Sequence, residues 1–164
     1  MKKTIAGVSL LVALLAVAAA GTQSAGADLA IQSASGFGQV HLGLPFRNFA
    51  FSATKELDGT VTGQAQLERR DSGILIHIDI DCLNVLGSIA VMSGVVTSTN
   101  SPTLPVGTDE LFAVQDNGEG PSAPPDEITL AFSGLGIACT DITDPGVLAP
   151  FLITIESGQI QVSS

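Results

Sequence analysis

The residues best suited to chemistry lie in the acidic loop 116–126, Asp-Asn-Gly-Glu-Gly-Pro-Ser-Ala-Pro-Pro-Asp. This loop holds three carboxylates and an amide oxygen, and its glycines allow backbone carbonyls to turn inward. Calcium prefers six to eight hard oxygen ligands, which such a loop can supply. The sequence therefore offers a calcium site with the candidate ligands Asp116, Asn117, Glu119 and Asp126.

The same loop also has a purely structural interpretation. Its spacing differs from that of an EF-hand loop, which needs ligands at alternate positions and a Glu at the twelfth. Asn117-Gly118 favours a tight turn, and the prolines stiffen the return of the chain. A rigid surface loop whose acids face water is the alternative to a calcium site.

A second polar set, His77, Asp79 and Asp81, has strand spacing. Residues two apart on a strand are separated by ~6.6 Å, so the set spans ~13 Å. One metal ion with ligand bonds of ~2 Å cannot hold all three side chains. We interpret them as a solvated polar strand face.

Catalytic patterns are weak, and we assign no catalytic residue. The chain contains no Gly-x-Ser-x-Gly elbow, and only His41 and His77 could act as bases at neutral pH. Seven Phe and no Trp or Tyr leave little for stacking sugars or bases. We therefore expect a non-catalytic domain, with a small secreted barrel enzyme as the alternative.

The element that organises these residues is the segment 73–85, which alternates apolar and polar side chains. Such a period of two, rich in β-branched residues, predicts a strand with one wet face. No segment outside the leader has a convincing helical period, and about nine short strands follow one another. We predict an all-β fold, an antiparallel meandering β-barrel of about eight to nine strands, with a Greek-key β-sandwich as the alternative. The predicted core-face residues are Ile74, Ile76, Ile78, Ile80 and Cys82.

Hairpin register follows from matching faces. A three-residue loop at 57–59, with Gly59 in the left-handed conformation, sets Phe51 opposite Ala65. The next hairpin sets Leu67 opposite Ile76, and both of its faces then agree in polarity.

Two other strands carry positional signals. The segment 36–42 is expected to form a short edge strand or a turn entry, because Pro45 would break a central ladder. The segment 89–96 is apolar on both faces, which predicts a covering layer.

The contents of the barrel separate the two functional hypotheses. An interior filled by large apolar residues would leave function on the loop-rich end, built from 98–108 and 116–126. A cavity lined by convergent polar groups and a buried carboxylate or His would favour an enzyme. The residues expected to fill the interior are Phe49, Phe51, Leu67, Ile74, Ile76 and Ile78.

The N-terminal segment has the pattern of a signal peptide. A short basic start precedes the apolar run 5–20, and Ala-Gly-Ala at 25–27 fits a cleavage site. Cleavage after Ala20 and an uncleaved anchor are the alternatives, but the apolar run is shorter than the ~20 residues a span needs. We predict a signal peptide at 1–27 and a single exported β domain at 28–164, secreted or periplasmic, with no membrane span after cleavage.

The strongly negative net charge excludes some classes of binding partner. Removal of residues 1–27 takes away two lysines, so the formal net charge changes from −10 to −12. Such an acidic protein repels nucleic acid and anionic lipid. We expect a small molecule or another protein as partner, and no cofactor other than the possible calcium.

The two cysteines, Cys82 and Cys139, are expected to form a disulfide in an exported chain. Closing a loop of about 57 residues stabilises by roughly 4 kcal/mol on the chain-entropy model. Two buried free thiols or a metal site are the alternatives. The disulfide would hold the segment 134–147 against the isoleucine face of the central strand.

Four short runs stand out together: 80–90, 93–97, 114–120 and 125–128. They resemble a group of exported bacterial β-domains of uncharacterised function, which has a Cys-Leu-x-Val strand, a Gly-x-Val-Thr strand and an Asp-Asn-Gly-Glu-Gly loop. The resemblance implies a secreted single domain and no known chemistry.

Overall fold

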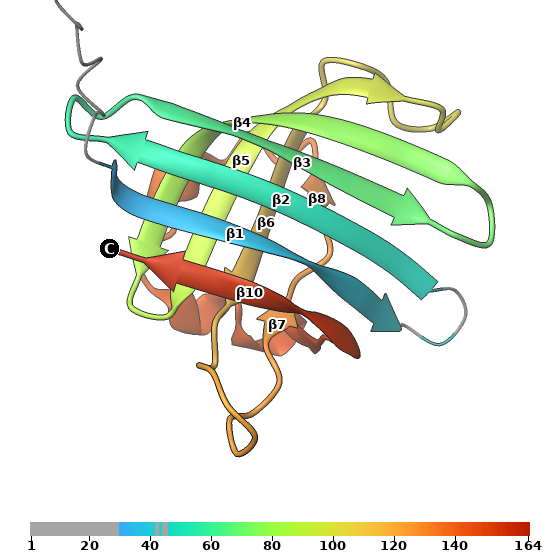
Figure 1. Ribbon diagram of the computed structural model, residues 1–164. Helices are drawn as coiled ribbons and strands as arrows, with labels where there is room; N and C mark the ends of the chain where they lie inside the picture. Colours follow the sequence, from blue (N-terminus) through green and yellow to red (C-terminus); the bar gives the residue numbers. More distant parts are fainter. Residues whose placement is uncertain (1–29, 42, 44–45) are drawn as a thin grey trace, which may run out of the picture.

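A computed structural model describes residues 30–41, 43 and 46–164, so the predicted signal peptide at 1–27 lies outside the described residues. The described chain is all-β and forms one antiparallel sheet curled into a half-barrel (Figure 1). Its strands are β1 (Ala30–His41), β2 (Phe46–Glu56), β3 (Val61–Arg69), β4 (Ile74–Leu86), β5 (Ile89–Thr99), β6 (Asp109–Gln115), β7 (Glu127–Ile128), β8 (Phe132–Ser133), β9 (Ile153–Thr154) and β10 (Ser157–Ser163). Three short 3-10 helices are η1 (Cys139–Asp141), η2 (Pro145–Val147) and η3 (Ala149–Phe151).

The strand order confirms the meandering fold. Neighbours along the sheet run β10-β1-β2-β3-β4-β5-β6-β7-β9, and β8 pairs with β6 beside this path. Consecutive hairpins join β1 to β6, and the last strand returns to lie beside the first (Figure 1). The strands therefore form a half-barrel of the meandering type.

The predicted hairpin registers are confirmed. Phe51 lies opposite Ala65, and Leu67 lies opposite Ile76. Gly59 has a φ of 88°, the left-handed conformation that the three-residue loop requires.

The expectation that the first strand is a short edge strand is wrong. β1 begins at Ala30, and it pairs with both β10 and β2. Its small residues have weak strand propensity, so the sequence pattern hid its first half. They fit here because Gly36 lies opposite Phe51, whose ring covers the glycine so closely that a Cβ would come within 2.9 Å of it.

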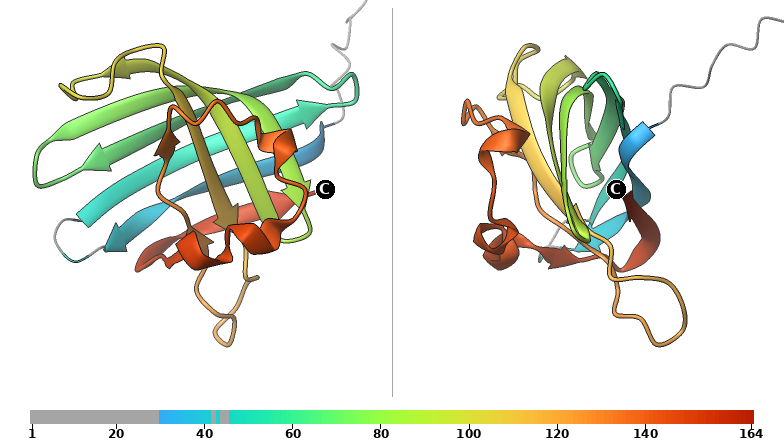
Figure 2. Two further views of the ribbon diagram at one scale, coloured as in Figure 1. Left: turned by 180° about the vertical axis from the view of Figure 1, so that it is seen from behind. Right: turned by 90° about the vertical axis from the view of Figure 1, so that its left-hand side faces the viewer.

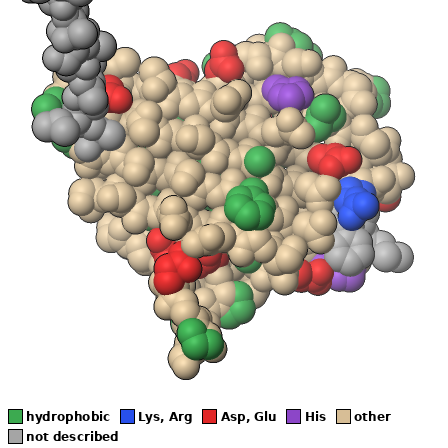
Figure 3. All heavy atoms as spheres, in the orientation of Figure 1, with side chains coloured by type: hydrophobic (Ala, Val, Ile, Leu, Met, Phe, Trp, Pro, Cys, Tyr) green, Lys and Arg blue, Asp and Glu red, His purple; other side chains and the backbone are tan. Residues whose placement is uncertain are grey.

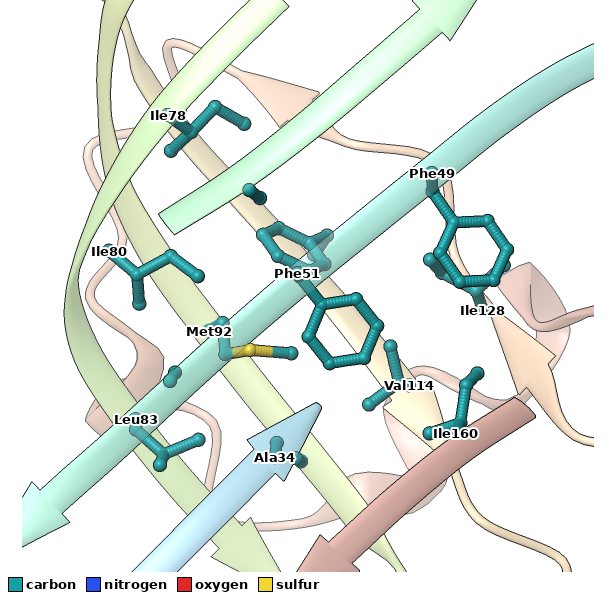
Figure 4. Close-up of a cluster of buried hydrophobic side chains, with 14 of the residues drawn as sticks. Ala34, Phe49, Phe51, Ile78, Ile80, Leu83, Met92, Val114, Ile128 and Ile160 are labelled. Atoms are coloured by element: carbon teal, nitrogen blue, oxygen red, sulfur yellow. The ribbon is translucent and has the colours of Figure 1, made fainter. Parts of the chain in front are cut away.

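The inner face of the half-barrel holds the main hydrophobic core. Figure 4 shows side chains from β1, β2, β4, β5, β6, β7 and β10 pointing toward one another. Phe51 contacts Phe112 edge-on, with ring centroids 5.9 Å apart. The buried residues labelled in this view are Ala34, Phe49, Phe51, Ile78, Ile80, Leu83, Met92, Val114, Ile128 and Ile160.

A β-bulge in β4 corrects the predicted position of Cys82. The register with β5 shifts between Ile80 and Cys82, so the extra residue exchanges the two faces of the strand. Ile80 and Leu83 both belong to the inner core, whereas Cys82 packs with the outer cluster. The predicted contact of 134–147 with the isoleucine face is therefore wrong, because the disulfide lies on the opposite face of the sheet.

The segment 134–152 forms an outer layer over β5 and β6 (Figure 2). The Cys82–Cys139 disulfide attaches it to β4, with the two Cα atoms 5.8 Å apart. The Asn84 side chain also donates to the carbonyl of Ile142 at 3.0 Å. This layer explains why β5 is apolar on both faces: Val91 packs under it while Met92 enters the inner core.

Candidate functional site

A cavity of about 320 Å³ lies at one end of the half-barrel. It is bounded by the end of β1, the start of β2, the β3–β4 hairpin, the loop 101–104 and the segment 128–133. Small-molecule sites commonly have volumes of about 300–1,000 Å³, so this cavity has room for a small ligand. Its apolar walls come from Val40, Phe49, Leu67, Ile74, Ile76, Leu104 and Ile128.

Glu110 is the most deeply buried ionisable residue in the cavity wall, with 2% of its surface exposed. It lies on β6 in phase with Phe112 and Val114, and these neighbours belong to the inner core. The Ser133 hydroxyl donates to Oε1 at 2.6 Å, while Oε2 is buried without a hydrogen-bond partner among the described residues. Burial raises the pKa of Glu110, and the bond from Ser133 opposes this shift only in part.

Two arginines line the cavity from neighbouring strands. Arg47 on β2 and Arg69 on β3 lie directly opposite each other in the register. Arg69 is half-exposed and places Nε 3.5 Å from Oδ1 of Asp71. Burial, and next the charge of Arg69, lower the pKa of Arg47, whereas Asp71 acts in the opposite direction.

Several residues of the cavity wall carry buried polar atoms without a hydrogen-bond partner among the described residues. Among the described residues, five buried side-chain atoms lack a hydrogen-bond partner. Three of them belong to residues of the cavity wall: Nε of Arg47, Oδ1 of Asn48 and Oε2 of Glu110. Buried polar groups are paired in the great majority of cases, so such a concentration marks a place where a bound molecule or water completes the bonding.

The predicted calcium ligands lie outside this cavity, in the loop 116–126. In two of them, the carboxylate oxygens accept hydrogen bonds from backbone N–H groups. Asp116 accepts from Gly118 at 2.8 Å and from Val162 at 3.0 Å. Asp126 accepts from Asn117 at 2.9 Å and from Ile160 at 2.7 Å. These two carboxylates thus join the ends of the loop 116–126 to β10.

The other two candidates are also bonded to protein donors. The Asn117 amide oxygen accepts from Gln115, and the Glu119 carboxylate accepts from Gln159. In the part of the chain that the structure describes, no group of three or more His, Cys, Asp or Glu side chains is placed to hold a metal ion. Acidic side chains do gather where this loop leaves the sheet (Figure 3), and calcium binding there stays a prediction.

The histidines and the polar strand face lie outside the cavity wall. His77 and Asp79 pair with Gln66 and Gln64, as the predicted register requires. His41 places Nδ1 3.3 Å from Oε1 of Glu156. Neither histidine is therefore a candidate base for this cavity.

Sequence reasoning placed Phe49, Leu67, Ile74 and Ile76 in the interior, where they line the cavity, but it missed the charged cavity residues, although a signal was present. Glu110 alternates with Phe112 and Val114, so strand periodicity places its carboxylate on the apolar face. The same reasoning puts Arg47 in phase with Phe49, and Arg69 in phase with Leu67. A charged residue in phase with buried apolar neighbours was the informative pattern.

The pH dependence of stability tests the environment of Glu110. Its folded-state pKa lies above the ordinary 4.5, so the native state holds this proton more strongly than the unfolded state. The resulting stabilisation is complete below the unfolded pKa and is lost as pH rises through the folded pKa. Because Gln stays neutral, we expect the Tm of Glu110→Gln to rise relative to the wild type as pH increases from about 4 to about 7.

The control for this experiment is Glu119→Gln, which changes an exposed carboxylate of the loop 116–126. Its Tm difference from the wild type is expected to change far less across the same pH range. A Tm difference for Glu110→Gln that does not vary with pH would contradict the raised pKa.

Comparisons with known proteins add no functional assignment. No family model, curated protein sequence or solved structure matches this chain. The resemblance to exported bacterial domains therefore stays a prediction, and the functional argument depends on the geometry of the cavity. Among the described residues, no helix has the length and apolar character needed to cross a membrane.

Proposed function

We propose that this protein is an exported, non-catalytic binding domain that holds a small, mainly apolar molecule in the cavity at the end of its half-barrel. The observation that carries the proposal is the combination of apolar walls with three unsatisfied polar atoms, on Arg47, Asn48 and Glu110. Ligand sites typically have this composition, because apolar walls supply affinity and a few polar groups fix orientation.

Two further observations support export and the use of a loop. The disulfide is of the kind that persists in oxidising compartments, which agrees with a signal peptide at 1–27. Of the two loops expected to form a contact surface, 98–108 contributes Ser101, Thr103 and Leu104 to the cavity wall. The other loop, 116–126, lies beside β10 and takes no part in this cavity.

A neutral fluorescent probe tests the proposal. N-phenyl-1-naphthylamine emits strongly in apolar surroundings. We expect saturable binding to the wild type. The substitution Leu104→Trp should fill part of the cavity and weaken binding at least about ten-fold, equivalent to about 1.4 kcal/mol.

The matched control is Val106→Trp. Val106 lies in the same loop, is 63% exposed and is not part of the cavity wall. This variant should bind the probe like the wild type. Equal weakening by both substitutions, or no saturable binding at all, would contradict the proposal.

One observation favours a second candidate function, a small secreted enzyme: the buried carboxylate of Glu110 is the feature expected above of an enzyme cavity. Binding is preferred because the cavity wall is largely apolar and neither histidine belongs to it. A buried carboxyl group with a raised pKa in a cavity can act as a general acid, and Glu110 has both properties. A screen of chromogenic esters and glycosides would test this candidate. Turnover that is lost in Glu110→Gln but retained in Glu119→Gln would support an enzyme, and absence of turnover throughout the screen would favour binding alone.

A further inference from the structure

The distribution of positive charge sets this cavity apart from the rest of the domain. Residues 28–164 contain only four basic side chains against sixteen acidic ones. Two of these four, Arg47 and Arg69, line the cavity, while Lys55 and Arg70 do not. A strongly acidic protein therefore places half of its positive charge in the wall of one cavity.

The two arginines are arranged in a way that is costly without an anion. Like charges directly opposite each other on an antiparallel pair destabilise a sheet. Asp71 offsets the charge of Arg69, but Arg47 has no carboxylate within ion-pair distance among the described residues. The Nε donor of Arg47 is also buried, and no described residue bonds it.

We propose that the ligand carries a carboxylate, which Arg47 and Arg69 bind together, and that its aliphatic body lies along the apolar wall of the cavity. This inference rests on the proposed binding function and specifies its ligand class, a singly charged carboxylate amphiphile. The planar guanidinium group presents paired N–H donors that match the two oxygens of a carboxylate.

The positions of the residues orient such a ligand. The Arg69 side chain is 44% exposed and lies where the cavity meets solvent. Glu110, by contrast, is the most deeply buried ionisable residue of the cavity wall. The carboxylate therefore lies toward solvent at the β2–β3 side, and the aliphatic body extends inward past Phe49, Leu67 and Ile76. A phosphate monoester has similar donor requirements, but its second negative charge is disfavoured in a protein this acidic.

Competition among three ten-carbon probes tests the charge preference. Decanoate, 1-decanol and decylammonium have the same aliphatic chain and differ in the head group. Each is titrated against bound N-phenyl-1-naphthylamine at neutral pH and low salt. We expect decanoate to displace it at concentrations at least about ten-fold lower than decanol, and decylammonium to be the weakest of the three.

Substitution of the arginines locates the effect. Arg47→Met keeps the length and apolar stem of the side chain, and it should weaken decanoate binding at least about ten-fold and decanol binding by much less. Arg69→Met should weaken decanoate binding less, by about three-fold, because this residue is more exposed and already contacts Asp71. Arg70→Met removes an equal charge outside the cavity wall and is the control, with an expected change below about two-fold.

The possible outcomes separate this inference from the proposed function. Decanol binding as tightly as decanoate, or decyl phosphate binding more tightly than decanoate, would overturn the carboxylate inference and leave the binding function intact. An equal loss in Arg47→Met and Arg70→Met would overturn it as well, since it would show only the effect of net charge. Failure of all the probes, including N-phenyl-1-naphthylamine, would overturn both the inference and the proposed function.

Discussion

Replacing Cys82 and Cys139 together with alanine is expected to lower the free energy of unfolding by about 4 kcal/mol. The disulfide closes a loop with a sequence separation of 57 residues, and it attaches the outer layer to the bulged part of β4. Without it, the unfolded chain gains conformational freedom, and the segment 134–152 keeps only its packing and a few hydrogen bonds. Urea denaturation of the wild type and the double variant measures this difference.

Chemical reduction supplies the control for this prediction. A reducing agent should destabilise the wild type by a similar amount and leave the double alanine variant unaffected. Equal stability of the oxidised and reduced wild type would contradict the assigned role of the disulfide. Loss of the outer layer should also increase hydrogen exchange at the β5 and β6 amides that flank it.

The substitution Asp126→Ala is expected to lower the free energy of unfolding by about 3 kcal/mol, the second largest effect that we predict. β10 ends the sheet order, and the carboxylates of Asp126 and Asp116 bond its N–H groups where a further strand would otherwise pair. Truncation removes the acceptor for the buried amide of Ile160 and for the amide of Asn117. Each loss of a charged acceptor from a backbone N–H costs about 1.5–3 kcal/mol.

Glu119→Ala is the matched control, because it removes a carboxylate from the same loop. Glu119 is exposed, and among the described residues it accepts from one side chain, that of Gln159, so its loss should lower the free energy of unfolding by less than about 1 kcal/mol. Faster hydrogen exchange at the Ile160 amide in Asp126→Ala would locate the damage at β10. Equal destabilisation by the two substitutions would contradict the bonding role of Asp126.

Strand periodicity and turn chemistry predicted the hairpins well. The Asp58-Gly59 turn and the matched faces of residues 61–69 and 74–80 determine the strand register. Any register shifted by one residue would place apolar side chains opposite polar ones at every position. The all-β fold and the meander followed from similarly local evidence, because each depends on short segments whose preferences agree with the whole fold. The disulfide followed instead from the presence of two cysteines in a chain with a predicted signal peptide.

The errors in the predicted fold have two causes. One inserted residue can change the alternation of faces along a strand, and pairing with neighbouring strands can override a low strand propensity. A single bulged residue before Cys82 exchanges the faces of β4, and the sequence carries no marker for it. The small residues of β1 form a strand because β10 and β2 flank them on both sides. Such effects depend on contacts between segments that are far apart in the sequence.

The candidate site was harder to predict than the fold for the same reason. The carboxylates of the loop 116–126 were predicted to form a calcium site because they lie close together in the sequence. Two of them instead accept hydrogen bonds from the backbone of β10. The predicted register of β2 and β3 already sets Arg47 opposite Arg69. Glu110 comes from β6, and only the curvature of the sheet brings it to the same end of the half-barrel, which strand phase alone could not predict.

Methyl NMR spectra recorded during titration with decanoate test the central claim most directly. The claim is that the cavity at the end of the half-barrel binds the ligand. It predicts the largest chemical-shift changes at the methyl groups of Leu67, Ile76 and Leu104, with little change at Leu111 and Leu148 in the outer cluster. Changes concentrated in the outer cluster, or no change at the cavity methyls while decanoate binds, would contradict it.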